Sequence, residues 1–441
     1  MKSYRKRGQG ASGLAMALAL AFVQGTASLR ADGVAAPPAA VVRLPVPANA
    51  CVQAGVPVDP FDITLNSFLF GQLTGATNGC SGDLLQVWDY TNQALVAAYR
   101  AGAGSSNLVD GAWYADLTHA TGSAIALPLG TGFLVSNRQA VAQELWMAGM
   151  LPGDSSIALV APTGFSLMAG PYPEALAFPA DSPIGAIDAL DVLQAWSATG
   201  SFARVFQPEL DGNSNLRFTP QSPAGDNGVL DLGQGFWYVR GVAETLSWPF
   251  ARPYEWLFDT NLTPRIVNAC ASPASGQIQL TIAAGSADGT FDIFRQNVGP
   301  GQNFAVSNTW TMLAAALPIS ANTSTNWTDT PPSRSGDMAD MLVYAVADNT
   351  RDSDGDDLPD GREVFLYHTD PFNRDTDSDG IPDGWEVKYG LNPLDPSDAA
   401  GDLVGDGVSN LRKYLEGRNP RVGVLAVANS ALSLSVLTPL E

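Results

Sequence analysis

A twelve-residue stretch near the C-terminus, DTDSDGIPDGWE, crowds five carboxylates into one short segment. Folding such a segment brings like charges together, which costs free energy unless something compensates them. The acids stand at positions 1, 3, 5, 9 and 12 of the stretch, and a glycine stands at position 6. A calcium ion takes about six to eight oxygens, and a calcium loop supplies them from positions 1, 3, 5, 7, 9 and 12, with glycine at the sharp turn. The predicted ligands are Asp375, Asp377, Asp379, the backbone carbonyl of Ile381, Asp383 and Glu386.

An earlier stretch, DSDGDDLPDGRE, repeats the pattern in the same register. It has Asp357 at position 6, where glycine is favoured. Aspartate tolerates the left-handed backbone better than most residues, so this loop is predicted to bind calcium more weakly. The predicted ligands of this first loop are Asp352, Asp354, Asp356, Asp360 and Glu363.

A third unit, 402–420, follows the same design less closely. It keeps Asp402, Asp406 and Asn410 but has Val404 and Lys413 where acids are expected, which predicts a degenerate site. A disordered acidic spacer is the alternative interpretation of all three units. That alternative does not explain the shared register, the glycine at position 6, or the apolar residues that follow the first two loops.

Residues 352–420 resemble thrombospondin type 3 repeats, which share the DxDxDG half-motif with EF-hand and dockerin loops. The resemblance implies calcium-dependent folding, an extracellular location and no catalysis by this segment. The whole arrangement, with the β-rich regions described below, is similar to that of large secreted bacterial multidomain proteins.

The N-terminus has the organisation of a secretory signal. Basic residues precede an apolar stretch, GLAMALALAFV, that is too short to span a bilayer, and small residues then offer a cleavage site. We therefore expect export to the outside of the cell or to its surface. The C-terminal segment is apolar but interrupted by polar residues, which favours a short β tail over a transmembrane span.

Most of the remaining chain contains an internal repeat. LLQVWDY is echoed by VLQAWSA, and LPLGTGF by LDLGQGF, in the same order in each half. Short apolar runs bounded by Gly, Pro, Asn and Asp predict strands, and the GxGF step predicts a tight turn that enters a strand. Trp88 and Trp196 should be equivalent, as should Phe133 and Phe236.

A third β region has alternating strands typical of a fibronectin type III or immunoglobulin-like sandwich, with Trp310, Trp327 and Tyr344 in its core. The predicted fold is thus a mainly β multidomain chain: two tandem β modules, one β-sandwich, then calcium-binding loop-helix repeats. The predicted boundaries are 1–28 (signal), 29–40 (Ala/Pro linker), 41–150 and 157–252 (the two β modules), 263–350 (the sandwich), 351–420 (the calcium repeats) and 421–441 (the β tail).

Composition excludes several functions. The formal net charge of −21 leaves no basic surface for phosphates, so nucleic acid is not an expected partner. The chain has only two histidines, His119 and His368, and no GxSxG, HExxH or Cys/His cluster. Cys51 and Cys80 are close enough in sequence to form a disulfide that leaves Cys270 free, but other pairings and free thiols stay open.

The favoured hypothesis is a secreted or cell-surface calcium-binding protein that is not an enzyme and serves adhesion, binding or structure. Its partner would be an extracellular protein or a polysaccharide. The alternatives are a carbohydrate-binding protein, with Trp113 or Trp237 as a stacking platform, and a polysaccharide hydrolase, which needs two carboxylates about 5–9.5 Å apart. Core packing is the more ordinary role for both tryptophans.

Overall fold

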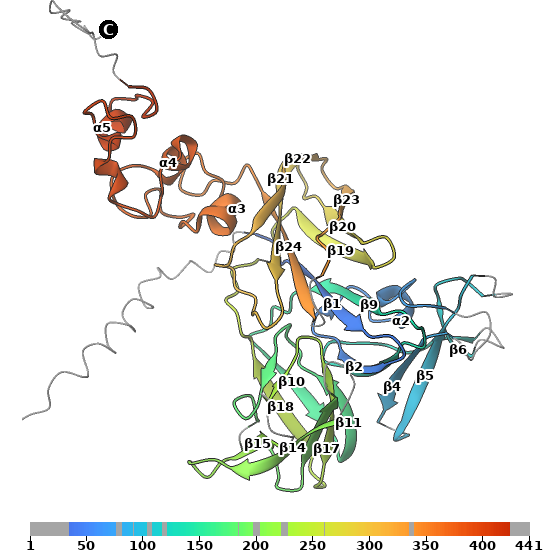
Figure 1. Ribbon diagram of the computed structural model, residues 1–441. Coiled ribbons are helices and arrows are strands. Elements are labelled where there is room, and N and C mark those ends of the chain that lie inside the picture. The colour runs from blue at the N-terminus through green and yellow to red at the C-terminus, as the bar shows by residue number, and fades with distance from the viewer. Residues whose placement is uncertain are drawn as a thin grey trace, which may run out of the picture. The chain divides into compact units, whose positions relative to one another are not determined.

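The computed structural model describes residues 35–75, 82–90, 92–103, 108–116, 121–183, 185–196, 203–221, 228–259, 261–334 and 339–423 (Figure 1). Antiparallel strands dominate it, and its helices are short, as the sequence predicts. The chain divides into two compact units, Met1–Asp348 and Asn349–Glu441. No described helix has the length and apolar character needed to cross a membrane. Outside the described residues lie the predicted signal segment, Cys80, His119 and residues 424–441 of the predicted tail.

The first unit contains two sheets of the same design. Their strand orders are β2-β8-β4-β5-β6-β7 and β11-β17-β13-β14-β15, so the first five strands of one correspond to the five of the other. The first sheet contains β2 (Cys51–Gly55), β4 (Leu84–Asp89), β5 (Ala94–Arg100), β6 (Trp113–Asp116), β7 (Thr121–Gly122) and β8 (Gly132–Ser136). The second contains β11 (Gly164–Ala169), β13 (Val192–Trp196), β14 (Ala203–Leu210), β15 (Leu216–Pro220) and β17 (Gly235–Arg240). The shared order agrees with the internal repeat in the sequence.

The register of the two sheets is also the same. Leu85 pairs with Val135 in the first sheet, and Leu193 pairs with Tyr238 in the second. This register makes Trp88 equivalent to Trp196 and Phe133 equivalent to Phe236.

The two modules contact each other through equivalent backbone groups. The N–H of Gly55 donates to the carbonyl of Gly233 at 2.8 Å, and the N–H of Ala169 donates to the carbonyl of Gly130 at 3.0 Å. Each bond joins the end of β2 or β11 to the turn before β17 or β8. The modules are therefore related by an approximate two-fold axis at this contact.

The GxGF step explains both glycines of each turn. The first glycine has a positive φ, 78° at Gly130 and 69° at Gly233, which confirms the predicted tight turn. The second starts the strand and lies against the other module. A Cβ at Gly132 would lie 2.6 Å from the backbone of Met168, and one at Gly235 would lie 2.3 Å from the carbonyl oxygen of Ala54.

Short strand pairs complete the modules. In the first, β1 (Ala39–Val46) pairs with β9 (Gln143–Met150), and in the second β10 (Ser156–Ala161) pairs with β18 (Leu246–Ala251). The smaller elements are β3 (Asp59–Pro60), α2 (Leu65–Phe68), β12 (Leu176–Ala177) and β16 (Val229–Leu230).

The third β region forms two packed sheets. One has the order β19-β20-β23 and the other β22-β21-β24-β1-β9-β3. The second sheet is therefore continuous with the first module, because β1 lies between β24 and β9, which the sequence did not indicate. The strands are β19 (Arg265–Ser272), β20 (Gln277–Ala283), β21 (Gly289–Val298), β22 (Thr311–Ile319), β23 (Ser324–Asp329) and β24 (Asp340–Asp348).

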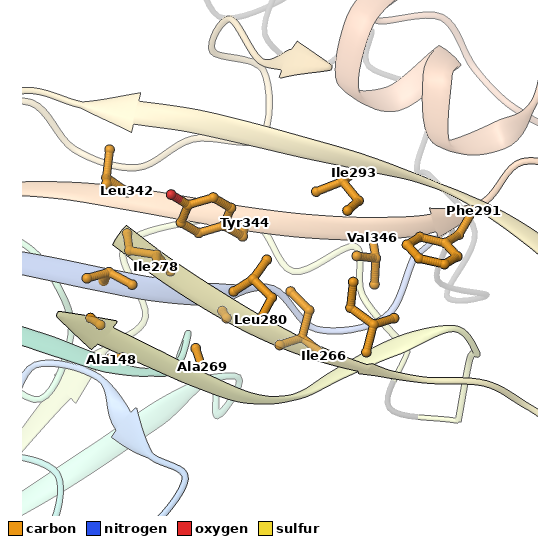
Figure 2. Packing of buried hydrophobic residues seen from close by; sticks show 14 of the residues in the cluster. Ala148, Ile266, Ala269, Ile278, Leu280, Phe291, Ile293, Leu342, Tyr344 and Val346 are labelled. Carbon is orange, nitrogen blue, oxygen red and sulfur yellow. The ribbon is translucent and has the colours of Figure 1, made fainter. Parts of the chain in front are cut away.

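The core between these sheets follows from strand periodicity. Alternate residues of β20 are buried, as expected when successive side chains point to opposite faces. Figure 2 shows Ile266 and Leu280 of one sheet together with Ile293, Tyr344 and Val346 of the other, and all five belong to one buried cluster. Tyr344 belongs to this cluster and Trp327 is partly buried against it, in agreement with their predicted core role. Trp310 is buried outside this cluster, where its ring meets Phe304 edge to face.

The second unit consists of loops and short helices. Two helical segments follow the acidic loops, and each ends at a residue with left-handed backbone, His368 (φ 61°) and Gly390 (φ 74°). Both helical segments end before the prolines that follow them, at left-handed C-terminal caps. The elements are α3 (Asp360–Arg362), the π-helical turn η1 (Glu363–Tyr367), α4 (Asp383–Tyr389), the 3-10 turn η2 (Asp398–Ala400) and α5 (Asn410–Leu415).

Candidate metal centre

The first aspartate of each acidic loop organises the turn that follows. Asp352 accepts the N–H of Gly355 at 2.8 Å and that of Asp357 at 3.0 Å. Asp375 accepts the N–H of Gly380 at 2.9 Å in the same way. Short acidic side chains favour such turns because they can accept hydrogen bonds from their own following backbone.

Position 6 has a left-handed backbone in both loops. The φ angle is 74° at Asp357 and 96° at Gly380. The sharp turn that the sequence predicts is therefore present in both loops, and Asp357 makes it without glycine.

Position 5 links the two loops. Asp356 accepts the N–H of Leu358 at 2.8 Å and, with its other oxygen, the N–H of Gly384 at 2.6 Å. Gly384 lies in α4 of the second repeat, and a Cβ there would lie 2.3 Å from the carbonyl oxygen of Asp356. The first loop therefore packs directly on the helix that carries the last ligand of the second loop.

Position 9 is already satisfied by protein donors. Asp360 accepts the N–H and the hydroxyl of Ser353, both at 2.7 Å. Asp383 accepts the N–H of Thr376 at 2.9 Å and its hydroxyl at 2.6 Å. Both carboxylates are fully buried. These two predicted ligands therefore bind the residue at position 2 of their own loop, which closes the loop. They are not in the tight carboxylate clusters.

The remaining predicted ligands converge in tight clusters, with the exception of Glu363, which is in none of them. Asp352, Asp354 and Asp356 bring ligand atoms within 4.8 Å of one another, and so do Asp375, Asp377 and Asp379. A third cluster of the same tightness combines Asp379 and Glu386 with Asp398.

Many of the predicted ligand oxygens are buried without a donor among the described residues. In the first loop they are both carboxylate oxygens of Asp354 and Oε2 of Glu363. In the second they are one oxygen each of Asp377 and Asp379 and both oxygens of Glu386. Glu363 and Glu386 are fully buried, and leaving a buried carboxylate unpaired is costly. The donor set, hard oxygens only, fits calcium.

Asp398 is a site residue that sequence reasoning missed. It lies in η2, outside the second loop, and its buried Oδ1 also has no donor among the described residues. The twelve-position pattern contains no place for it, so only the fold brings it to Glu386.

The electrostatics of both loops are those of crowded, desolvated acids. Burial and then the charges of Asp354 and Asp356 raise the pKa of Glu363 to about 9. Burial and then the charges of Asp379 and Asp377 raise the pKa of Glu386 to about 9. A bound divalent cation would lower the pKa of both glutamates, because it favours their ionised form.

Calcium held here would take side-chain oxygens from positions 1, 3, 5 and 12 of each loop. At position 7 the ligand would be a backbone carbonyl, and Ile381, whose side chain is fully buried, can offer no other. The first loop has the equivalent residue Leu358, which is also buried.

The other residues that the sequence singled out lie elsewhere. His368 is outside the clusters, and its Nδ1 lies 3.2 Å from the carbonyl oxygen of Val364. Trp113 is fully buried and its indole N–H donates to the carbonyl of Leu69 at 2.9 Å. Among the described residues Cys51 and Cys270 form no disulfide.

Residues 352–373 and 375–396 match the family model of the bacterial TSP3 repeat. Each match contains one of the two acidic loops, so the resemblance to thrombospondin type 3 repeats is confirmed for this part of the chain. A comparison with curated proteins finds none that matches the chain. The third unit and the β-rich regions lie outside the matched residues, so the match identifies two repeats of this chain as bacterial TSP3 repeats.

Proposed function

We propose that this protein is exported and binds calcium through the two acidic loops, which stiffen a segment attached to β-rich binding modules. The single observation that carries the calcium assignment is the pair Glu363 and Glu386. Each is fully buried at position 12 of its loop, and no described donor satisfies Oε2 of Glu363 or either carboxylate oxygen of Glu386. Burying an unpaired carboxylate costs free energy, and here it occurs at the same position of two loops. A bound cation would compensate that cost in both loops.

The extracellular location is supported by the N-terminal sequence and by the chemistry of the site. Calcium modules outside the cell bind with dissociation constants of about 10⁻⁴ to 10⁻³ M, which suits extracellular calcium. Residues 1–28 consist of a basic segment, an apolar segment and a run of small residues, in that order. This is the order of a secretory signal, which would direct the chain out of the cell.

The β modules are the proposed binding part, with an extracellular protein or a polysaccharide as partner. The strand order β19-β20-β23 facing β22-β21-β24 supports a fibronectin type III-like sandwich. Such sandwiches commonly present loops and sheet faces to partners, and this role requires no catalysis.

The carbohydrate-binding alternative gains no support from the two tryptophans that the sequence suggested. Trp113 is buried, and Trp237 meets Trp88 edge to face, with ring planes 85° apart. A sugar-stacking platform needs aromatic rings that lie flat toward solvent.

Calorimetric titration of the chelated full-length protein tests the calcium assignment. We expect two calcium ions per chain at millimolar calcium, and the loss of one in Glu386→Gln. Glu416→Gln, the same change at an exposed glutamate outside the two loops, should bind as the wild type does. Absence of binding at millimolar calcium, or equal affinity in Glu386→Gln, would refute the assignment.

Affinity capture from the extracellular fraction, with and without calcium, tests the binding role. Recovery of a defined protein or polysaccharide would support it. Release of products from a polysaccharide incubated with the protein would favour the hydrolase alternative instead.

A further inference from the structure

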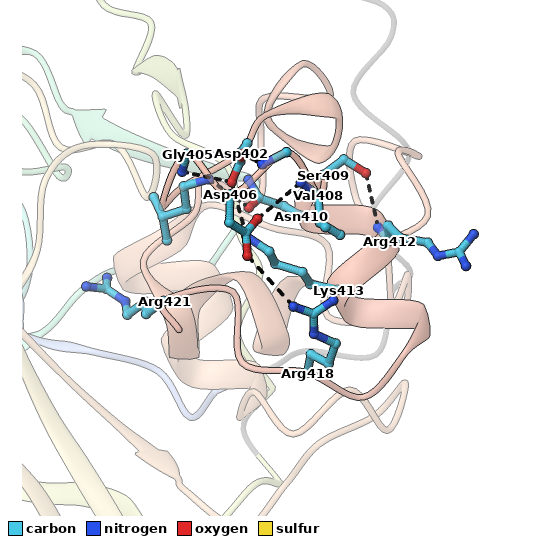
Figure 3. Close-up of polar contacts among 12 residues, drawn as sticks. Asp402, Gly405, Asp406, Val408, Ser409, Asn410, Arg412, Lys413, Arg418 and Arg421 are labelled. Atoms are coloured by element: carbon cyan, nitrogen blue, oxygen red, sulfur yellow. Dashed lines mark hydrogen bonds and ion pairs between the residues drawn. The ribbon is translucent and has the colours of Figure 1, made fainter. Parts of the chain in front are cut away.

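The third unit keeps the backbone scaffold of the two calcium loops (Figure 3). The N–H of Gly407 donates to Asp402 at 2.6 Å, as that of Gly380 does to Asp375 in the second loop. The N–H of Val408 donates to Asp406 at 3.1 Å, which repeats the bond at position 5 of the other loops. The turn therefore forms in this unit although the acids at positions 3 and 12 are missing.

The residue at position 9 of the third unit also makes the same hydrogen bond as in the second loop. The side-chain oxygen of Asn410 accepts the N–H of Leu403 at 3.2 Å, as Asp383 accepts the N–H of Thr376. An amide can replace the carboxylate here because the bond needs only an acceptor.

A lysine occupies position 12. The side chain of Lys413 is fully buried, and its Nζ lies 3.1 Å from Oδ1 of Asp402 and 2.9 Å from Oδ1 of Asp406. These are the carboxylates of positions 1 and 5. In the second loop the acid of position 5, Asp379, has a ligand atom within 4.8 Å of one of the buried Glu386. The ammonium thus stands among the carboxylates that would otherwise surround an ion, as Figure 3 shows.

The charges of the third unit balance internally. Asp402 and Asp406 face Lys413, and Arg418 lies 3.7 Å from Oδ2 of Asp406. Burial raises the pKa of Asp402, but the N–H of Gly407 and the ammonium of Lys413 outweigh it and hold that pKa below its usual range. The first loop instead gathers six acids at its twelve positions and the second loop five.

We infer that the third repeat is a metal-independent unit in which the ammonium of Lys413 replaces the calcium ion. This inference goes beyond the proposed function, because it assigns the third loop a built-in cation and no ion from solution. The unit stays folded when calcium is removed.

The metal-independent third repeat also contacts the helix of the second calcium site. The rings of Trp385 in α4 and Tyr414 in α5 pack with centroids 5.4 Å apart, and Arg421 donates to the carbonyl of Tyr389 at 2.5 Å. The third repeat and the residue that follows it therefore pack on α4, the helix that carries Glu386.

Hydrogen exchange of the full-length chain tests the inference. In the wild type, chelation should speed exchange in α4 and leave α5 within about twofold of its calcium-loaded rate. Lys413→Met should speed exchange in α5 on the order of a hundredfold, with or without calcium, because removing one partner of a buried ion pair is strongly destabilising. Lys388→Met, the same change at an exposed lysine of α4, should leave α5 unchanged.

Lys413→Glu provides a second test that does not depend on how Lys413→Met folds. It restores the acid at position 12, so protection of α5 should be lost in chelator and regained in millimolar calcium, with one more ion bound per chain. Loss of α5 protection in chelated wild type, or wild-type protection in chelated Lys413→Met or Lys413→Glu, would overturn the inference. Failure of the first two loops to bind calcium would refute the proposed function but leave these results for α5 unaffected.

Discussion

Asp357 and Gly380 show how one turn position accepts two different residues. Both have positive φ, but only glycine lacks the Cβ that makes this backbone costly. The N–H of Asp357, which donates to Asp352, does not depend on the side chain. The side chain is therefore dispensable for the turn.

Asp357→Gly should tighten the first site or leave it unchanged. Removing the left-handed strain of a side chain is worth up to about 1 kcal/mol, which corresponds to a several-fold gain in affinity. Calorimetric titration of the variant against the wild type measures it. A clear loss of calcium affinity would mean that the Asp357 carboxylate itself helps to bind the ion.

The pH dependence follows from Glu363 and Glu386. Without metal, each is protonated in the folded repeats up to a pKa of about 9 but ionises near its ordinary value of 4.5 when unfolded. The folded state therefore binds more protons, and stability of the metal-free repeats falls as pH rises from about 4.5 to about 9. Calcium binding at neutral pH must then release protons, and affinity should rise with pH.

Titrations in buffers of different ionisation enthalpy measure that proton release. Hydrogen exchange of the chelated protein at pH 5 and pH 8 measures the stability change. Equal calcium affinity at both pH values would show that these two carboxyls are not protonated in the metal-free protein.

At the scale of elements, the contact between the two modules depends on the glycines at which β8 and β17 begin. Gly132 and Gly235 occupy equivalent places, and each lies against the backbone of the opposite module. Equivalent strands in both modules therefore meet without intervening side chains, which fixes their distance.

Gly235→Ala should destabilise the first unit by about 1–3 kcal/mol, because its Cβ would lie 2.3 Å from the carbonyl oxygen of Ala54 and the backbone must move. Gly212→Ala is the matched control, since a Cβ there meets nothing within 4 Å. Thermal unfolding of both variants measures the difference. Equal midpoints would show that the two modules can separate at this contact without cost.

At the scale of the whole first unit, β1 joins parts that are far apart in sequence. It pairs with β24 on one side and β9 on the other, so one sheet runs from the third β region into the first module. Arg43 of β1 donates to Asp340 of β24 through Nε at 2.8 Å, and both residues are buried. This ion pair links β1, near the start of the first unit, to β24 at its end.

Arg43→Met should lower the stability of the first unit by about 3–5 kcal/mol, since it leaves the buried carboxylate of Asp340 without its partner. Arg265→Met, at an exposed position of β19, should change it by no more than about 0.5 kcal/mol. Denaturant unfolding measures both. A change in Arg43→Met as small as in the control would mean that this ion pair does not stabilise the pairing of β1 with β24.

Local patterns carried most of what could be predicted. The loop positions, the turn at Gly380 and the echoing GxGF steps depend on neighbours within a few residues, so their physical causes are visible in the sequence. Strand pairing adds that Gly55 is equivalent to Ala169, since these two pair with Gly132 and Gly235.

Longer-range features could not be read in this way. The segment AAVVRLPV of β1 is a nearly continuous apolar run, and nothing in it says that Tyr344 will be the neighbour of Ala39. Asp398 reaches Glu386 only through the turn that follows α4. Lys413 looked like a lost ligand, because a pattern of acids cannot show that an ammonium stands where an ion would.

The position of β1 also sets an order of events during synthesis. A ribosome makes Ala39–Val46 early, and β24 emerges roughly 300 residues later, which takes about 15–60 s at 5–20 residues per second. Throughout that time one edge of β1 has no strand beside it, and open strand edges invite wrong pairing. The first unit therefore closes its central sheet only after nearly all of it has been made.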